Sequence, residues 1–265
     1  DDQSLMNVSP VLGVISGDEY YFPDNTWAAI SNPIERNSYI WADDVYEGRT
    51  VSDWNIPYQQ VFNANVVLEG LAGYTPKPSE KSEYDAIKGG ALFFRSNAFL
   101  NLAQLFAAPY SEETTSSPGI PLRLSADVNL KSVRGTLKET YDQSIADLNA
   151  AADLLPLKSP YKTRPSRLAV YALLSRTYLN MGDYSKAAAL ADSCLKYQNA
   201  LVDFSKLNAT AARPVPKFND EVILHQILIN YTFDLNGIID TNLYRSYSAN
   251  DLRKVVFFTD RGKGV

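Results

Sequence analysis

Residue types that could carry out nucleophilic, acid–base or metal chemistry are sparse in this chain. His225 is the only histidine and Cys194 the only cysteine among 265 residues, so a usual zinc site or an intrachain disulfide cannot be assembled. Any Ser-His-Asp triad would have to use His225, and no nucleophile-elbow sequence is present. The sequence therefore predicts no enzyme, no metal and no cofactor, with His225 a satisfied core residue and Cys194 a buried structural thiol.

Adjacent carboxylates occur at Asp43-Asp44 and at Glu112-Glu113. Glycosidases need two carboxyl groups roughly 5 to 10 Å apart across a sugar, which adjacency in sequence does not predict. Asp43, Asp44 and Asp53 could hold Ca²⁺, but the spacing of an EF-hand loop is absent. We interpret both pairs as solvated loop charge, and a glycoside hydrolase stays only as an alternative.

The composition is that of an acidic globular protein rich in tyrosine. The formal charge is −5, from 25 basic and 30 acidic residues, and no basic tract of the kind that follows phosphates occurs, which argues against nucleic-acid binding. Tyrosine, present 17 times, offers an apolar face and a hydroxyl that suit packing and ligand contact. No apolar run approaches the roughly 20 residues that span a bilayer. The start at Asp1 is interpreted as that of a processed or trimmed protein.

Helical periodicity fills the middle of the chain. It predicts helices over residues 53–71, with Pro57 in the first turn, and over residues 80–107. A long polar connection follows at 109–133. A capping box, Thr136 with Glu139, then opens a helix that stops at Pro156.

Residues 164–195 form a predicted helical hairpin that turns at Gly182. Before the turn, one face carries Leu168, Tyr171, Leu174, Thr177 and Tyr178. After it, a face of small residues carries Ala187, Leu190, Ala191 and Cys194. This order of large and small positions fits the tetratricopeptide pattern. Further on, the β-branched run at 221–229 predicts a strand, and the last 36 residues read as irregular.

Several motifs then occur in a recognisable order. They are Gly90-Ala91-Leu92-Phe93-Phe94-Arg95-Ser96 through Leu105-Phe106; Gly119-Ile120-Pro121-Leu122; Tyr141 with Asp147-Leu148, Ala151 and Leu154-Leu155-Pro156; Arg167, Ala169, Ala172, Tyr178, Leu179, Met181-Gly182-Asp183-Tyr184 and Ala187; and Asp251-Leu252-Arg253. Together, over about residues 50–260, they resemble the SusD/RagB family of Bacteroidetes outer-membrane nutrient-binding lipoproteins.

The resemblance implies a mainly α fold of tetratricopeptide-like hairpins with long decorating loops and few short strands. We expect a single domain over 1–265, with a helical repeat core at about 53–200 and loop-rich flanks at 1–52 and 201–265. Family members are usually about twice as long, so the usual C-terminal part is expected to be absent. Arg95, Arg167 and Asp183 are assigned structural roles in caps and ion pairs.

The resemblance also implies the partners and the location. We expect a glycan ligand, polysaccharide or oligosaccharide, and delivery of it to a SusC-like TonB-dependent transporter. The protein would face the exterior of the outer membrane, held by a lipid anchor on a cysteine that this chain does not contain. A peptide ligand, or a tetratricopeptide adaptor that binds a protein, stays as the alternative.

Sugars are bound by aromatic faces together with amide and charged groups, and the first 55 residues concentrate these side chains. The candidate ligand-binding residues are Trp41, Tyr20, Tyr21, Trp27, Arg36, Asn37 and Tyr39. Trp41 is the leading candidate because polar residues flank it in a segment without clear amphipathicity. The alternative is that Trp41 packs against the helices, and packing is expected for Trp27 and for Trp54, which opens a helix.

Overall fold

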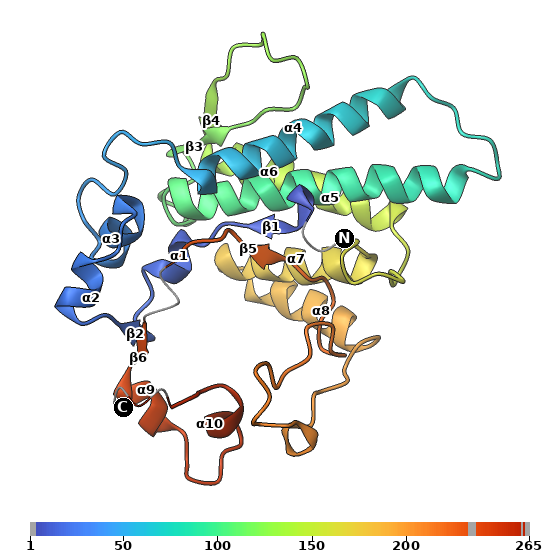
Figure 1. The fold of residues 1–265 in the computed structure, drawn as a ribbon. Coiled ribbons are helices and arrows are strands. Elements are labelled where there is room, and N and C mark those ends of the chain that lie inside the picture. The colour runs from blue at the N-terminus through green and yellow to red at the C-terminus, as the bar shows by residue number, and fades with distance from the viewer. Residues whose placement is uncertain (1–3, 233–236, 261, 263–265) are drawn as a thin grey trace. The chain divides into compact units, whose positions relative to one another are not determined.

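The computed structural model describes residues 4–232, 237–260 and 262 (Figure 1). Two compact units make up the chain. The first contains Asp1–Pro10, Ser52–Asn199 and Val222–Ile229, and the second contains Val11–Val51, Ala200–Glu221 and Asn230–Val265. The single domain expected over residues 1–265 stays a prediction.

The first unit is built from long helices, and it confirms the predicted mainly α class. Its helices are α4 (Ser52–Ala72), α5 (Lys81–Phe106), α6 (Leu137–Leu154), α7 (Arg167–Asn180) and α8 (Tyr184–Leu195). The hairpin of α4 and α5 and the hairpin of α7 and α8 are both visible in Figure 1. The predicted boundaries of these helices are therefore confirmed to within a few residues.

Capping side chains set the helix ends where the sequence predicts them. The Thr136 hydroxyl accepts a hydrogen bond from the Glu139 amide at 3.1 Å, and the Glu139 carboxylate accepts one from the Thr136 amide at 2.7 Å. This pair confirms the capping box of α6. Asp183 accepts from the Lys186 amide at 3.1 Å and so caps α8, while Gly182 makes the turn with a φ of 78°. Only glycine adopts such a left-handed backbone without a steric penalty.

Two clusters of buried side chains form the core of the first unit. The larger joins α5, α6 and α7 and contains Leu92, Phe93, Leu100, Ala103, Leu137, Tyr141, Leu148, Ala151, Leu155, Ala169, Val170, Leu173 and Leu174. The smaller joins α4 and α5 to the segment that follows them and contains Val61, Ala98, Phe99, Leu102 and Ile120. Trp54 packs against this second cluster, as expected.

Two glycines allow the helices to come this close. A Cβ at Gly89 would lie 2.8 Å from Leu155 Cγ, and one at Gly119 would lie 2.5 Å from the Thr136 carbonyl oxygen. Both distances are shorter than non-bonded atoms tolerate. Glycine is therefore needed where α5 packs on α6, and again where the Gly119-Ile120-Pro121-Leu122 motif begins beside α6.

Two predictions about backbone structure are wrong. Because α4 begins at Ser52, Pro57 lies inside the helix rather than in its first turn, where it leaves one helical carbonyl without its usual donor. The strand predicted at 221–229 is reduced to β5 (Ile227–Leu228). Ile223 and Leu224 pack against the helical core instead of pairing, so their apolar character reflects burial and not a strand.

The strands of the first unit are short. β1 (Val8–Ser9), which follows the turn η1 (Leu5–Asn7), pairs with β5 in parallel, Val8 opposite Ile227. β3 (Pro118–Pro121) pairs antiparallel with β4 (Arg134–Thr136), at the foot of a loop that projects from the helices in Figure 1. Gln60 on α4 fixes the N-terminal segment, because its amide donates to the carbonyls of Leu5 and Val8 at 2.8 and 2.6 Å.

The second unit consists of short elements joined by loops. They are α1 (Leu12–Ile15), β2 (Tyr20–Tyr21), α2 (Asp24–Ala28), α3 (Pro33–Tyr39), η2 (Phe204–Lys206), β6 (Ile238–Ile239), α9 (Thr241–Ser246) and α10 (Arg253–Val256). β2 and β6 pair antiparallel. Glu35, which is 2% exposed, accepts hydrogen bonds from the Thr232 amide and hydroxyl at 3.1 Å, so α3 is tied to a segment from the far end of the sequence.

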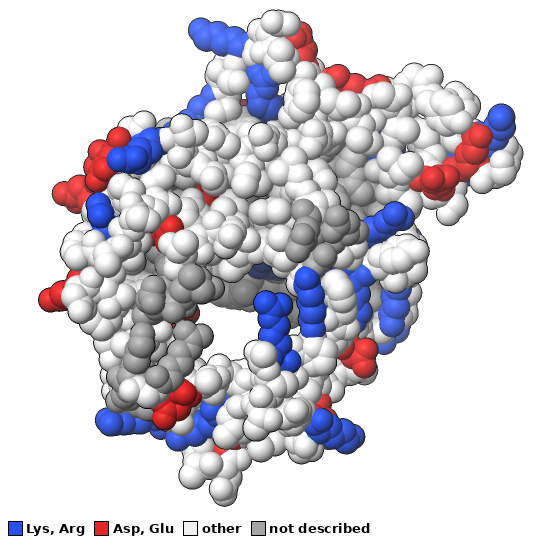
Figure 2. All heavy atoms as spheres, viewed as in Figure 1, with Lys and Arg blue, Asp and Glu red and all other residues white. Residues whose placement is uncertain are grey.

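The tip of the α4–α5 hairpin carries paired charges of both signs. Figure 2 shows acidic and basic side chains together at the tip of the α4–α5 hairpin, and an uncharged stretch over the middle of the same helices. At that tip Lys81 pairs with Asp85, and Lys77 pairs with Glu80 at 3.7 Å. Opposite charges that neutralise each other locally make no continuous field for a polyanion.

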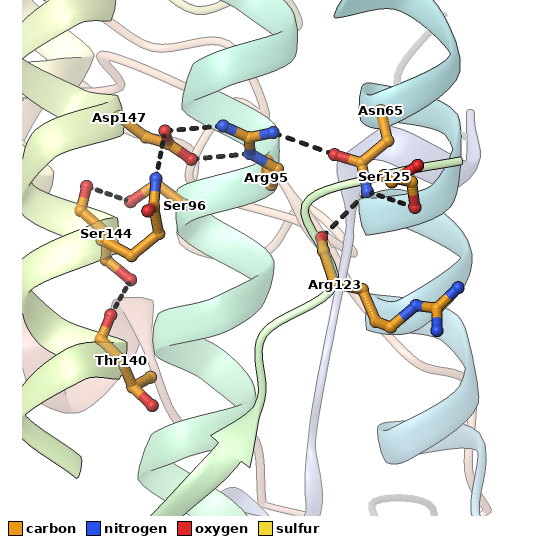
Figure 3. A network of polar contacts seen from close by, with 9 residues as sticks. Asn65, Arg95, Ser96, Arg123, Ser125, Thr140, Ser144 and Asp147 are labelled. Atoms are coloured by element: carbon orange, nitrogen blue, oxygen red, sulfur yellow. Dashed lines mark hydrogen bonds and ion pairs between the residues drawn. The ribbon is translucent and has the colours of Figure 1, made fainter. Parts of the chain in front are cut away.

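A buried polar network joins α4, α5 and α6 (Figure 3). Arg95 donates from Nε and Nη2 to the two carboxylate oxygens of Asp147, both at 2.7 Å, and from Nη1 to Asn65 Oδ1 at 2.9 Å. The Asn65 amide in turn donates to the carbonyls of Arg123 and Ser125 at 2.9 and 3.2 Å. Arg95 therefore has the structural role assigned to it from the sequence. Through Asn65, the same network also holds the start of the β3–β4 loop.

Candidate functional site

A hollow in the second unit brings together three of the predicted ligand-binding residues. Its volume is about 730 Å³, which is in the range of sites for small ligands. The lining residues are Ser16, Gly17, Asp18, Tyr20, Tyr39, Ile40 and Trp41. The turn after α1, the strand β2 and the end of α3 supply them, so residues about twenty positions apart in sequence meet around one opening.

Trp41 is held in an exposed position at this hollow. Its side chain is 77% exposed, which contradicts the alternative that it packs against the helices. Its backbone has a φ of 55°, a left-handed conformation that costs a residue with a side chain about 1–2 kcal/mol. The indole Nε1 donates to the Ser16 carbonyl at 3.1 Å. This bond fixes the orientation of the ring and leaves its faces for contact with a ligand.

Tyr20 and Tyr39 form an ordered aromatic wall beside it. Their rings stack with centroids 6.1 Å apart and an interplanar angle of 29°, and both meet the buried Phe22 edge to face. The Tyr20 hydroxyl donates to the Ile15 carbonyl at 2.5 Å. Burial, with smaller contributions from Tyr39 and Glu19, raises the pKa of Tyr20. The Tyr39 oxygen accepts from the Phe22 amide at 3.0 Å.

The other predicted residues do not line the hollow. Tyr21 points away on β2 and is 41% exposed. Trp27 is half-buried and donates from Nε1 to the Arg36 carbonyl at 3.2 Å. Arg36 donates to the Ile30 carbonyl at 3.3 Å, and Asn37 donates to the carbonyls of Asp44 and Val45 at 3.3 Å and to the Glu47 carboxylate at 3.0 Å. The Asn37 contacts hold the loop that follows Trp41. Those of Trp27 and Arg36 tie α3 to α2 and to the segment between them.

The turn Ser16-Gly17-Asp18 contributes to the hollow and was not predicted. Asp18 supplies a carboxylate, which would accept hydrogen bonds from ligand hydroxyls. The only signal in the sequence is the Ser-Gly-Asp composition, which is typical of any turn. Its role depends on Trp41, 25 residues later, donating back to the Ser16 carbonyl.

The arrangement of this hollow suits binding. Flat aromatic faces can pack against the C–H face of a sugar ring, while Asp18 can accept hydrogen bonds from its hydroxyl groups and the Tyr39 hydroxyl can donate to them. Hydrolysis of a glycoside by the usual mechanism needs two carboxyl groups. Among the described residues that line the hollow, Asp18 is the carboxylate.

Other candidates for chemistry have structural surroundings. His225 donates its backbone amide to the Lys162 carbonyl at 2.6 Å. The Cys194 thiol is buried, donates to the Leu168 carbonyl at 3.3 Å, and burial raises its pKa. Within residues 4–232, 237–260 and 262, no group of three or more His, Cys, Asp or Glu side chains could hold a metal. None of the helices described there is long and apolar enough to cross a membrane.

Comparisons with known proteins agree with the resemblance in the sequence. The family of SusD-like proteins described as starch-binding and associating with the outer membrane matches residues 16–179, more than half of the chain. SusD-like protein P2 of Formosa agariphila is 27% identical over 155 residues, which are 58% of this chain and 28% of that protein.

Solved structures of SusD-like proteins are also similar to this chain. A SusD superfamily protein from Bacteroides thetaiotaomicron VPI-5482 is 28% identical, with a TM-score of 0.59, over 64% of this chain and 38% of that one. A laminarin-binding SusD-like protein shares the fold, with a TM-score of 0.60 and 21% identity, over 81% of this chain and 45% of that one. This chain thus spans less than half the length of each of these three relatives.

Proposed function

This chain belongs to the SusD-like family, and from that premise we propose that it binds a polysaccharide or oligosaccharide at the hollow of Tyr20, Tyr39 and Trp41. The family is described as starch-binding, and its match to this chain begins at residue 16, the first residue of the hollow. The helical unit would then serve as the scaffold, and the ligand would contact the loops of the second unit.

The exposed, oriented indole of Trp41 is the observation that supports this proposal most. A tryptophan that is 77% exposed buries little of its large apolar surface in the folded chain, and burial of that surface is its main contribution to stability. Its left-handed backbone adds a further cost. Costs of this kind are concentrated at functional sites, and an apolar ring face at the rim of an open hollow is a natural surface for a sugar.

We also propose capture without turnover and delivery to a transporter. The description of the family as starch-binding supports binding without hydrolysis. The family's association with the outer membrane supports a place on the outer face of that membrane, with a lipid anchor upstream of this chain and a SusC-like TonB-dependent transporter as the recipient. The anchor and the transporter come from the family resemblance and not from any contact in this chain.

A binding panel tests the carbohydrate part of this proposal. Laminarin and starch are the first glycans to try, because a laminarin-binding protein shares the fold and the family is described as starch-binding. The purified chain should be retarded in gels that contain its polysaccharide, with no release of reducing ends on long incubation. A chain that migrates unchanged through every polysaccharide of a broad panel would contradict glycan binding, and steady release of reducing ends would contradict capture without turnover.

A further inference from the structure

A second hollow lies within the helical unit, and the proposed function gives it no role. Its volume is about 550 Å³. The C-terminal half of α4, the N-terminal half of α5, the segment from Leu155 to Pro165 and Met6 of η1 surround it. Apolar side chains supply most of its lining, among them Val67, Ile87, Phe94, Leu155, Pro160 and Pro165.

Gly90 lines this hollow and is not required by close packing of the helices. A Cβ at Gly90 would meet only Pro165 Cγ, at 3.8 Å, whereas one at the neighbouring Gly89 would collide with Leu155. Close packing of α5 on α6 therefore explains Gly89 and does not explain Gly90. Glycine inside a helix costs about 1 kcal/mol of stability relative to alanine. At position 90 no close contact requires glycine, and the space beside it belongs to the hollow.

The walls of the hollow select against both sugars and ions. The polar side chains of the described lining are Asn63, Glu83, Ser159 and Arg164. The hydroxyls of a sugar that lie against the remaining, apolar lining would lose their hydrogen bonds to water, which is unfavourable. The charged residues among its described lining are Glu83 and Arg164, whose opposite signs leave the opening without a net charge. A ligand that complements both features is apolar and uncharged.

We propose that this hollow binds a small uncharged molecule with an aliphatic or aromatic body, at a site separate from the hollow of Trp41. The volume lies within the roughly 300–1,000 Å³ of sites for small ligands, which often lie between packed helices. Helices and prolines form the walls, so the site is present before the ligand arrives, and little conformational entropy is lost on binding.

A fluorescent hydrophobe tests the site directly. N-phenyl-1-naphthylamine, which is uncharged and aromatic, should bind the purified chain with a saturable rise in emission. Gly90→Leu places a side chain in the hollow and should weaken this binding about tenfold or more, equivalent to about 1.4 kcal/mol. Gly70→Leu is the matched control, since Gly70 also lies in a long helix and a Cβ there meets nothing within 4 Å; its affinity should equal that of the wild type.

A second pair of variants keeps the test decisive if Gly90→Leu does not fold. Ile87 lines the hollow and Val66 does not, and each is 46% exposed on its helix. Ile87→Gln should weaken binding of the probe, while Val66→Gln and Trp41→Ala should leave it unchanged. Absence of saturable binding to the wild type would overturn the proposal. So would equal affinity in Ile87→Gln and Val66→Gln, because the probe would then be bound elsewhere.

Discussion

Arg95 and Asp147 form a buried, two-pronged ion pair that joins the middle of α5 to the middle of α6. Both N–O distances are 2.7 Å, and the two side chains are 10% and 5% exposed. Gln143 adds a third hydrogen bond to the same carboxylate at 2.9 Å. The pair is thus fully hydrogen-bonded, as a buried charge must be. Its partner Asn65 extends the connection to α4, so three helices share one polar network.

Removing one side of this pair should be costly. Asp147→Ala leaves the Arg95 guanidinium buried without its counter-charge, and we expect a loss of about 3–5 kcal/mol in the free energy of unfolding. Guanidinium unfolding followed by circular dichroism measures it. Asp142→Ala on the same helix, which removes only the exposed partner of Lys138, should leave the midpoint nearly unchanged. Equal midpoints for the two variants would contradict the assigned role of the pair.

Adjacent glycines on α5 should respond in opposite ways to alanine. Gly89→Ala forces a Cβ against Leu155, and overpacking of this kind costs typically about 1–3 kcal/mol. Gly90→Ala meets only open space near Pro165 and should stabilise the helix by up to about 1 kcal/mol. Thermal unfolding of the two single variants beside the wild type gives the comparison. A stabilised Gly89→Ala would show that α5 and α6 are packed less closely than described.

The capping box of α6 should make stability depend on pH at the acidic end. The hydrogen bonds from the Thr136 amide and hydroxyl lower the pKa of Glu139 below its ordinary value. Because the folded state binds the proton more weakly than the unfolded state, the carboxylate's contribution is complete above the unfolded pKa and is lost as pH falls through the folded pKa. Urea midpoints of wild type and Glu139→Gln should therefore differ at pH 7 and converge near pH 3.

Glu112→Gln is the control for this pH comparison, since Glu112 is an exposed carboxylate outside the helices. Its midpoint should follow that of the wild type at both pH values. A difference between wild type and Glu139→Gln that persists unchanged at pH 3 would show that the carboxylate charge is not what stabilises the cap.

The helical unit could be predicted from the sequence because its signals are local. Periodicity, the Thr136 and Glu139 capping box and the turn at Gly182 each act within a few residues. The strand predicted at 221–229 was wrong for the opposite reason. Its apolar residues pack on helices that lie far away in sequence, and only Ile227 and Leu228 find a strand partner, at Val8 and Ser9.

The candidate site could be predicted in part. Tyr20, Tyr39 and Trp41 are predicted as ligand-binding residues because the first 55 residues concentrate aromatic and polar side chains of the types that bind sugars, and the structure brings these three together. Arg36 and Asn37 were also named, but their side chains donate to backbone carbonyls of nearby loops. Sequence alone does not tell such internal donors from donors to a ligand.

The central claim is that the indole of Trp41 is a binding surface for a glycan. Isothermal titration of the polysaccharide that binds best should give at least a tenfold weaker affinity for Trp41→Ala, equivalent to about 1.4 kcal/mol. Tyr184→Ala, which removes an aromatic side chain that is 70% exposed on α8, should bind like the wild type. Unchanged affinity in a folded Trp41→Ala protein would contradict the account.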